Sequence, residues 1–119
     1  MKDNNVVVVK SKTFALRIIR LYQILNQRHE HIMSKQMLRS GTSIGANVKE
    51  AIRGQSRADF FAKLNIALKE ASETEYWLEL LHESGYIDNE AAYQSIYQEC
   101  QELISILVAI TKAQSQSTL

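Results

Sequence analysis

The sequence predicts an all-α fold, an antiparallel up-down-up-down four-helix bundle in a single domain over residues 1–119. Three observations predict it. The 119 residues include no proline, which helix interiors tolerate poorly. Good helix formers such as Ala, Leu, Glu, Lys and Gln are abundant. Apolar residues recur at steps of three and four in four segments, and the short links between these segments make successive helices antiparallel.

The first two predicted helices span residues 11–28 and 34–53. Residues 1–9 contain the run "VVVV", whose β-branched side chains disfavour a helix. We therefore expect an extended or mobile arm there, followed by a helix that Ser11 or Thr13 caps. The polar stretch "RHEH" links the two helices. Their apolar stripes are Phe14, Ile18, Leu21 and Leu25, and then Met37, Leu38, Ile44, Val48 and Ile52.

The last two predicted helices span residues 57–84 and 89–113. Ser56 and Asp59 form a capping pair at the start of the first, and Gly85 follows its end, where a helix-ending glycine belongs. Asp88 is expected to cap the fourth helix. The stripes are Phe60, Leu64, Ala67, Ala71, Thr74, Leu78 and Leu81, and then Tyr93, Ile96, Cys100, Leu103, Leu107 and Ile110. Such stripes predict closely aligned helix packing.

Charge is distributed unevenly along the chain, although the net charge is only +1. Residues 1–70 hold 13 Lys and Arg against 5 Asp and Glu, whereas residues 71–119 hold one against 8. Two interpretations stay open. Basic and acidic helices can lie side by side and neutralise each other, or the basic residues can form a face for a polyanion.

The stretch "RSGTSIGANVKEA" places two glycines four residues apart, Gly41 and Gly45. It is not a P-loop, because that motif needs four residues between its glycines and a Gly-Lys-Ser/Thr end. One helical turn separates the two glycines, so they form a small face that lets another helix approach closely. We favour close helix packing over a ligand site. For Asn47 and Glu50, in the same stretch, the simplest expectation is a buried polar contact.

Residues that could carry catalysis or hold a metal do not combine into a recognisable site. Cys100 falls on the core stripe of the fourth helix, which favours a buried structural thiol over a nucleophile. Glu79 and His82 have the Glu-x-x-His spacing of di-iron bundles, but such sites need a second pair and two more glutamates. Both residues are therefore expected on the surface. The sequence predicts that the protein is not an enzyme and has no catalytic residue, metal or cofactor.

The chain also carries no targeting signal that we recognise. Four consecutive apolar residues near the N-terminus are too few for a signal peptide core. The longest later apolar run, "LISILVAI", is far shorter than a membrane span. A single cysteine fits a reducing compartment. We expect a cytoplasmic protein with no membrane partner.

A resemblance to a known family rests mainly on "SKQMLRSGTSIGANVKEAIRGQSRADFFAKLNIALKEASETEYWLELLHESGYI". This block resembles the bacterial four-helix bundle proteins called 23S rRNA-intervening-sequence proteins, and "KSKTFALRIIRLYQIL" fits the same family. The resemblance covers roughly residues 5–112, with its most specific part between Arg39 and Trp77. Many relatives have proline where this chain has Gly45. The family is similar in fold to the accessory variability determinant proteins of diversity-generating retroelements.

The resemblance implies a homopentamer, a ring of bundles around a central channel. It also implies candidate partners: another copy of the chain, RNA or DNA, and a reverse transcriptase or other protein, since the retroelement relatives bind nucleic acid and a reverse transcriptase through a basic surface. Two functions remain open. One is a nucleic-acid-associated oligomeric module; the other is a structural or protein-interaction adaptor with no nucleic-acid role.

The candidate nucleic-acid-binding residues are basic residues of the first three helices that fall off the apolar stripes. They are Arg17, Arg20, Lys35, Arg39, Lys49, Arg53, Arg57 and Lys63. Phosphate contacts of this kind position a protein on nucleic acid without reading its sequence.

Overall fold

The computed structural model describes residues 2–117, with side chains over residues 6–113. Four helices make up this part of the chain: α1 (Lys2–Gln27), α2 (Met33–Ile52), α3 (Arg57–Glu83) and α4 (Glu90–Ser117). No strand occurs among the described residues. The predicted all-α fold class is therefore confirmed.

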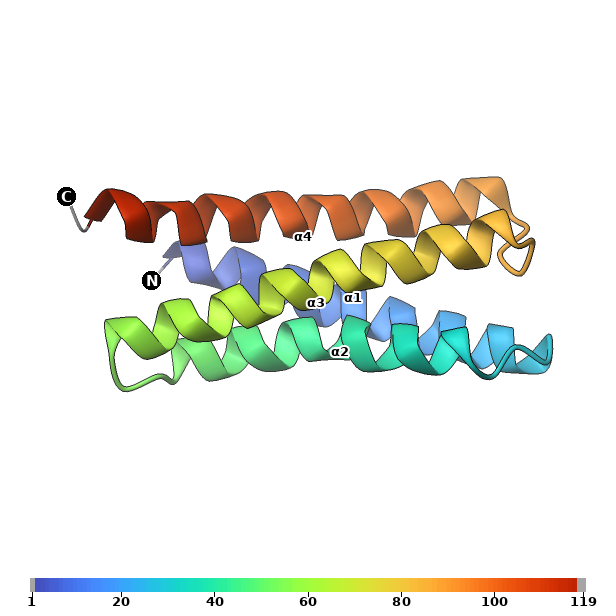
Figure 1. Ribbon diagram of the computed structural model, residues 1–119, viewed down its shortest axis with the longest axis horizontal. Coiled ribbons are helices and arrows are strands. Elements are labelled where there is room, and N and C mark those ends of the chain that lie inside the picture. The colour runs from blue at the N-terminus through green and yellow to red at the C-terminus, as the bar shows by residue number, and fades with distance from the viewer. Residues whose placement is uncertain (1, 118–119) are drawn as a thin grey trace.

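The helices pack side by side in an elongated bundle of 49 × 21 × 21 Å. Each helix contacts two others, because α1 and α3 both pack against α2 and α4. Figure 1 shows the start of α1, the end of α4 and the α2–α3 link at one end of the bundle. The other two links lie at the opposite end. This arrangement divides the bundle into two hairpins, α1–α2 and α3–α4.

The N-terminal segment is helical, so the prediction of an arm over residues 1–9 is wrong from Lys2 onward; residue 1 lies outside the described part. Val7 is only 1% exposed and belongs to the core. Burying a side chain of this size stabilises a fold by about 1.5–3 kcal/mol, more than the helix propensity of valine costs, about 0.5 kcal/mol. Ser11 and Thr13 consequently lie inside α1 rather than at its cap, and the Ser11 hydroxyl donates to the Val8 carbonyl at 3.2 Å.

The hydrophobic core takes side chains from all four helices and follows the predicted stripes closely. Its largest fully buried members include Phe14, Ile18, Leu25, Met37, Ile44, Leu64, Leu78, Leu81, Leu103 and Leu107. Two positions beside the α2–α3 link differ from the prediction by one residue. Ala51 and Phe61 are buried, whereas Ile52 is exposed and Phe60 is half-buried. At a helix end, packing rather than spacing decides which of two adjacent apolar residues turns inward.

The α1–α2 link is built around a buried carboxylate, which the sequence analysis treated only as part of a polar stretch. Glu30 is 6% exposed. Its carboxylate accepts hydrogen bonds from the backbone N–H groups of Ile32, Met33 and Ser34 at 3.2, 3.1 and 2.6 Å. A helix leaves its first N–H groups without partners, and Glu30 supplies acceptors for those of α2. Burial by itself raises the pKa of Glu30, but the hydrogen bonds from this backbone outweigh it and hold the pKa below its ordinary value.

The α3–α4 link turns at a glycine instead. Gly85 has φ 89°, a conformation that residues with a Cβ rarely adopt, and the Ile87 N–H donates to the Leu81 carbonyl at 3.0 Å. The predicted helix-ending role of Gly85 is confirmed. The Asp88 cap is wrong, because Asn89, one residue nearer to α4, accepts the Ala92 N–H at 3.0 Å.

The remaining cap lies at the start of α3. The Ser56 hydroxyl accepts the Asp59 N–H at 3.1 Å, which confirms Ser56 as the capping residue. Asp88, displaced from its predicted role, forms an ion pair with Arg28 at 2.8 Å. The ion pair connects the ends of the two hairpins.

Two glycines of α2 face α1, and α2 runs through both without interruption. A Cβ added at Gly41 would lie 2.9 Å from two side-chain carbons of Ile18, closer than real Cβ contacts allow. A Cβ at Gly45 would lie 3.4 Å from the Ser11 carbonyl oxygen and hydroxyl, an ordinary contact. Gly41 is therefore the position at which the approach of α2 to α1 requires a glycine.

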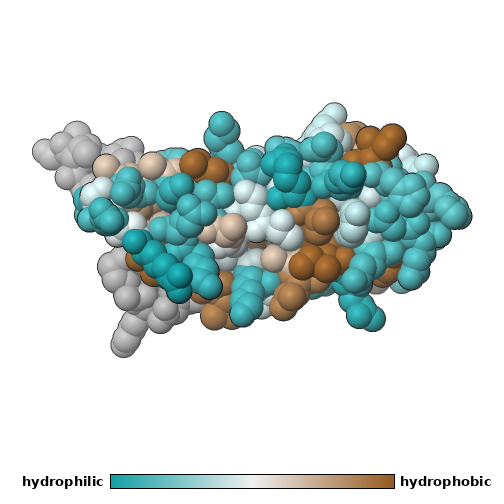
Figure 2. Space-filling view, turned by 90° about the horizontal axis from the view of Figure 1, so that it is seen from below, coloured by the Kyte–Doolittle hydropathy of each residue, from teal (hydrophilic) through white to brown (hydrophobic). Residues whose placement is uncertain are grey.

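The surface is mainly polar, with separate apolar patches. Figure 2, seen from the side on which α2 lies, shows hydrophobic patches between hydrophilic residues. On α1, Val9 and Leu16 are 63% and 60% exposed. They are seven residues apart and therefore share one face of the helix, which points away from the core.

Candidate nucleic-acid interface

The two hairpins carry opposite charge. We call residues 6–53 of the α1–α2 half the basic hairpin, since they hold nine Lys and Arg against two Glu. Residues 57–113 of the α3–α4 half form the acidic hairpin, with four Lys and Arg against ten Asp and Glu. The uneven charge of the sequence is thus a division between two sides of one bundle.

Some of the candidate basic residues are neutralised across the boundary between the hairpins. Arg17 of α1 pairs with Glu99 of α4 at 2.5 Å and donates to the Ser95 hydroxyl at 3.1 Å. Lys63 of α3 pairs with Glu50 of α2 at 3.1 Å. These residues join the two hairpins, as the neutralising interpretation of the charge pattern expects.

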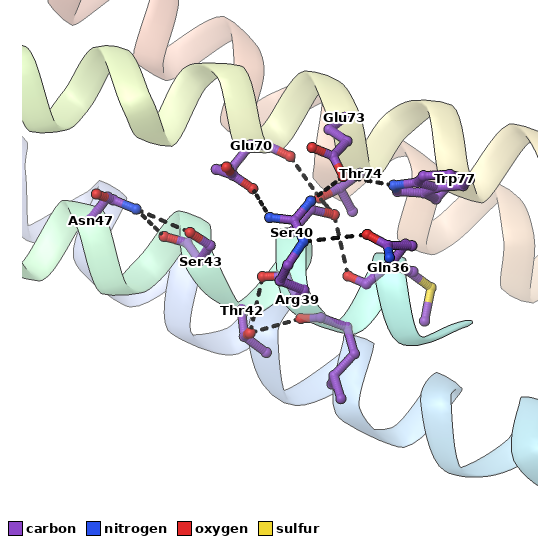
Figure 3. A network of polar contacts seen from close by, with 12 residues as sticks. Gln36, Arg39, Ser40, Thr42, Ser43, Asn47, Glu70, Glu73, Thr74 and Trp77 are labelled. Carbon is purple, nitrogen blue, oxygen red and sulfur yellow. Dashed lines mark hydrogen bonds and ion pairs between the residues drawn. The ribbon is translucent and has the colours of Figure 1, made fainter. Parts of the chain in front are cut away.

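Arg39 is the most extensively paired candidate. Its guanidinium contacts two carboxylates of α3, those of Glu70 at 3.2 Å and Glu73 (Figure 3). The Trp77 indole N–H donates to Glu73 at 2.9 Å. The indole hydrogen bond lowers the pKa of Glu73 and Arg39 lowers it further, against the effect of burial. The charge of Arg39 is therefore neutralised by carboxylates of α3, and the side chain links α2 to α3.

Polar residues near Arg39 make contacts within the bundle as well. The buried hydroxyls of Ser40 and Thr74 lie 2.8 Å apart between α2 and α3 (Figure 3). The Asn47 amide donates to Ser43 of its own helix, to the carbonyl at 2.9 Å and to the hydroxyl at 3.1 Å. Of the buried contact expected for Asn47 and Glu50, Asn47 shows only a half-buried one within its own helix, and the expectation is wrong for Glu50, whose side chain is 59% exposed. Glu50 instead pairs with Lys63 at the surface, where its charge stays in contact with solvent.

Four other candidates are exposed and have no carboxylate partner among the described residues: Arg20, Lys35, Lys49 and Arg53. All four belong to the basic hairpin. Lys49 lies in the last turn of α2 and Arg53 directly follows that helix, so the structure brings these two together. Lys35 lies in the first turn of α2 and Arg20 on α1, away from that pair.

Two further basic residues complete the description. Arg57, at the start of α3, places its guanidinium carbon 5.2 Å from the centre of the Phe61 ring. Lys12 is exposed on α1 and borders the same hollow as Lys49 and Arg53. The sequence analysis left Lys12 out, although Lys12 lies in the predicted helix over residues 11–28 and off its apolar stripe. The rule that selected the other candidates, a basic residue away from the apolar stripe, is the signal that could have included Lys12.

The acidic hairpin contains titratable groups that contact one another. Glu79 and His82, expected on the surface, are half-buried. Glu79 accepts the Tyr97 hydroxyl at 2.5 Å, and the His82 ring stacks on Tyr93 with ring centres 3.7 Å apart. They are less exposed than expected because a residue beside the core seam of α3 also contacts α4.

Cys100 is fully buried, as predicted. Its thiol lies 3.4 Å from the Ala71 carbonyl, and burial raises its pKa to about 12. Such a thiol remains protonated near neutral pH and is a poor nucleophile. Among residues 6–113, no three His, Cys, Asp or Glu side chains are grouped so that they could hold a metal ion.

Within the described part of the chain, no helix combines the length and the apolar character that a membrane crossing requires.

Comparisons with known proteins agree with this architecture. Residues 3–109 match the family model of the 23S rRNA-intervening sequence protein. The crystal structure of a protein of unknown function from the S23 ribosomal protein family of Bacteroides thetaiotaomicron is similar, with 57% sequence identity and a TM-score of 0.88. The alignment covers 92% of this chain and 98% of that one. No match to a curated protein was found.

Proposed function

Because the chain belongs to the 23S rRNA-intervening sequence protein family, we propose that it is a non-enzymatic homo-oligomer that binds nucleic acid through the basic hairpin. The oligomer is a ring of five up-down-up-down bundles. The ring repeats the same basic surface at each subunit, so that weak contacts of single chains add up.

The observation that carries the proposal is the set of unpaired cations on the basic hairpin. Arg20, Lys35, Lys49 and Arg53 are exposed and lack carboxylate partners among the described residues. Cations that a fold leaves without carboxylate partners attract phosphates and release their counterions. Contacts of this kind give binding with little sequence preference.

Fluorescence anisotropy with a labelled RNA hairpin and a labelled DNA duplex tests the proposal. We expect binding at low ionic strength that weakens with salt by roughly 0.9 log units per phosphate contact for each log unit of salt on duplex DNA. The double variant Lys49→Glu/Arg53→Glu should bind more weakly. Lys69→Glu/Lys112→Glu is the matched control, since it makes the same change of charge on the acidic hairpin.

Two outcomes would contradict nucleic-acid binding. One is the absence of binding at low salt. The other is an equal loss in both double variants, which would report net charge rather than a site. Either result would favour the adaptor function, for which the exposed Leu16 on α1 and Ile32 in the α1–α2 link, 60% and 79% exposed, offer apolar contacts to a protein partner.

The oligomer needs its own test. The exposed face of α1 with Val9 and Leu16 supports a subunit contact, because grouped exposed apolar residues mark interaction surfaces. Light scattering should give a mass near five times the 13.6 kDa of one chain. Leu16→Glu should lower that mass, whereas Ile66→Glu, at an exposed apolar residue of α3, should not. A monomer at micromolar concentration would refute the ring.

A further inference from the structure

A hollow of about 530 Å³ lies in the seam between α1 and α2. Three cations line it: Lys12 from α1, and Lys49 and Arg53 from α2 and its end. The rest of its lining is small or apolar, with Gly45 and Ala46 among the small residues. No acidic residue occurs in this lining.

A hollow beside α1 is lined by Arg17 and Arg20 without an acid, but Arg17 is paired with Glu99. Two other hollows contain acids. The hollow on the α3 side of Lys49 and Arg53 also contains Glu50 and Asp59. A hollow between α1 and α4 contains Glu99 and Glu102. In both, carboxylates compensate the cations. The α1–α2 hollow joins two helices of the basic hairpin, and neither contributes an acid to it.

Small side chains account for the room in the hollow. Gly45 and Ala46 of α2 and Ala15 of α1 line it and contribute at most one methyl group each. Uncompensated like charges around a partly enclosed space repel one another, and a bound anion relieves that repulsion. The volume also lies within the range of small-ligand sites, about 300–1,000 Å³, and exceeds what a phosphate group alone would fill.

We infer that this hollow is a discrete binding site for the phosphate group of a nucleotide. Lys12 contacts the phosphate from α1, Lys49 and Arg53 contact it from α2, and the apolar side chains of Val8 and Ile52 border the sugar and base. No aromatic residue lines the hollow, so bases are not selected by stacking. The inference stands apart from the proposed function, since a single chain could hold one nucleotide without a ring or a nucleic-acid strand.

Two-dimensional NMR titration of the whole protein with AMP, UMP, adenosine and inorganic phosphate tests the site. AMP and UMP should shift the amide signals of Gly45 and Ala46 with similar affinities, whereas adenosine should not. Inorganic phosphate should shift the same signals at higher concentration. A dinucleotide is titrated with and without a 5′-phosphate. Shifts by the phosphorylated form alone indicate that the hollow binds a terminal phosphate, and equal shifts by both forms indicate that it binds an internal phosphodiester.

Two variants distinguish the site from general electrostatic attraction. Lys49→Gln/Arg53→Gln should weaken AMP binding at least about ten-fold, because a charge-assisted contact is worth roughly that factor. Lys69→Gln/Lys112→Gln, with the same loss of charge on the acidic hairpin, should leave it unchanged. Ala46→Trp, which fills the hollow without changing charge, should also abolish the shifts while the melting temperature stays near that of the parent.

Equal binding of adenosine and AMP, or AMP binding that survives Lys49→Gln/Arg53→Gln, would overturn the inference. AMP binding without any binding of RNA or DNA would support the site and refute the proposed function. RNA binding without shifts by either mononucleotide would refute the nucleotide site and support the proposed function.

Discussion

The basic and acidic hairpins have the same architecture, two antiparallel helices joined by a short link, but different contacts hold them together. In the basic hairpin α2 approaches α1 through Gly41 and Ile18, and no ion pair joins the two helices among the described residues. In the acidic hairpin larger polar side chains connect the helices, among them Tyr97 with Glu79. The comparison teaches that the contact between α1 and α2 depends on a glycine that lets the helices approach closely, whereas the contact between α3 and α4 uses hydrogen bonds between side chains.

The strongest test of this difference is Gly41→Leu. The added side chain would overlap Ile18 in a buried position, and overpacking of this kind costs about 1–3 kcal/mol. Urea denaturation should show that loss in the free energy of unfolding. Ile18→Ala in the same chain should recover part of it, because the smaller residue makes room.

Gly45→Ala is the matched control for Gly41→Leu. Its Cβ would meet Ser11 at an ordinary distance, and alanine is favoured over glycine inside a helix by about 0.5–1 kcal/mol. We expect equal or higher stability. Equal losses at both glycines would contradict the single close approach at Gly41.

The two links provide the next comparison. Glu30→Ala should destabilise the fold by about 1–2 kcal/mol, as loss of a good helix cap does, and Gly85→Ala by about 1–2 kcal/mol through its left-handed backbone. Only the first effect should depend on pH. The folded state holds the pKa of Glu30 below its unfolded value, so its contribution is fully present above the unfolded pKa and is lost as pH falls through the folded pKa.

Urea titrations of both link variants and the parent, at neutral pH and near pH 3, measure this difference. The difference in the free energy of unfolding between the parent and Glu30→Ala should shrink at the acidic pH, whereas the difference between the parent and Gly85→Ala should persist. A gap for Glu30→Ala that is independent of pH would show that its carboxylate does not stabilise α2 through its charge.

A smaller effect is expected from Tyr97→Phe in the acidic hairpin. The change removes the hydrogen bond to Glu79 and keeps the ring, which should cost about 1 kcal/mol. The bond to Glu79 raises the pKa of Tyr97, so its contribution is present below the unfolded pKa and is lost as pH rises through the folded value. Near the ordinary pKa of tyrosine, about 10, the parent and Tyr97→Phe should give equal phenolate absorbance in the near ultraviolet. A weaker signal from the variant at that pH would contradict the bond.

The smallest effect concerns the ion pairs that join the two hairpins. Arg28 and Asp88 are both largely exposed, and solvent weakens the attraction between exposed charges. A double-mutant cycle with Arg28→Ala and Asp88→Ala should therefore give a coupling energy smaller than the loss in Tyr97→Phe, and salt should reduce it. A coupling energy larger than that loss would show that charge, rather than the shared core, holds the hairpins together.

The sequence predicted the features that depend on local spacing better than those that depend on distant packing. The stripe from Leu64 to Leu81 and the glycine at position 85 depend on local spacing, and both agree with the structure. The start of α1 does not, because the burial of Val7 against distant residues decides its conformation. Likewise, no local pattern could indicate that Glu30 folds back onto the backbone of α2.

The candidate site shows the same limit. Spacing correctly placed the basic residues away from the core, but whether each is free depends on residues far along the chain. Arg17 and Glu99 are 82 positions apart, and only the packing of α1 against α4 brings them together. The division of the candidates into paired and unpaired cations therefore required the structure.

The separation of charge between the two hairpins has a consequence for how the protein behaves in salt solution. At physiological ionic strength the field of a charge decays over about 8 Å, whereas the bundle is 21 Å wide. A neighbouring surface therefore senses one hairpin and not the net charge of +1. The protein should bind to both cation- and anion-exchange resins at neutral pH, each time through the opposite side of the bundle.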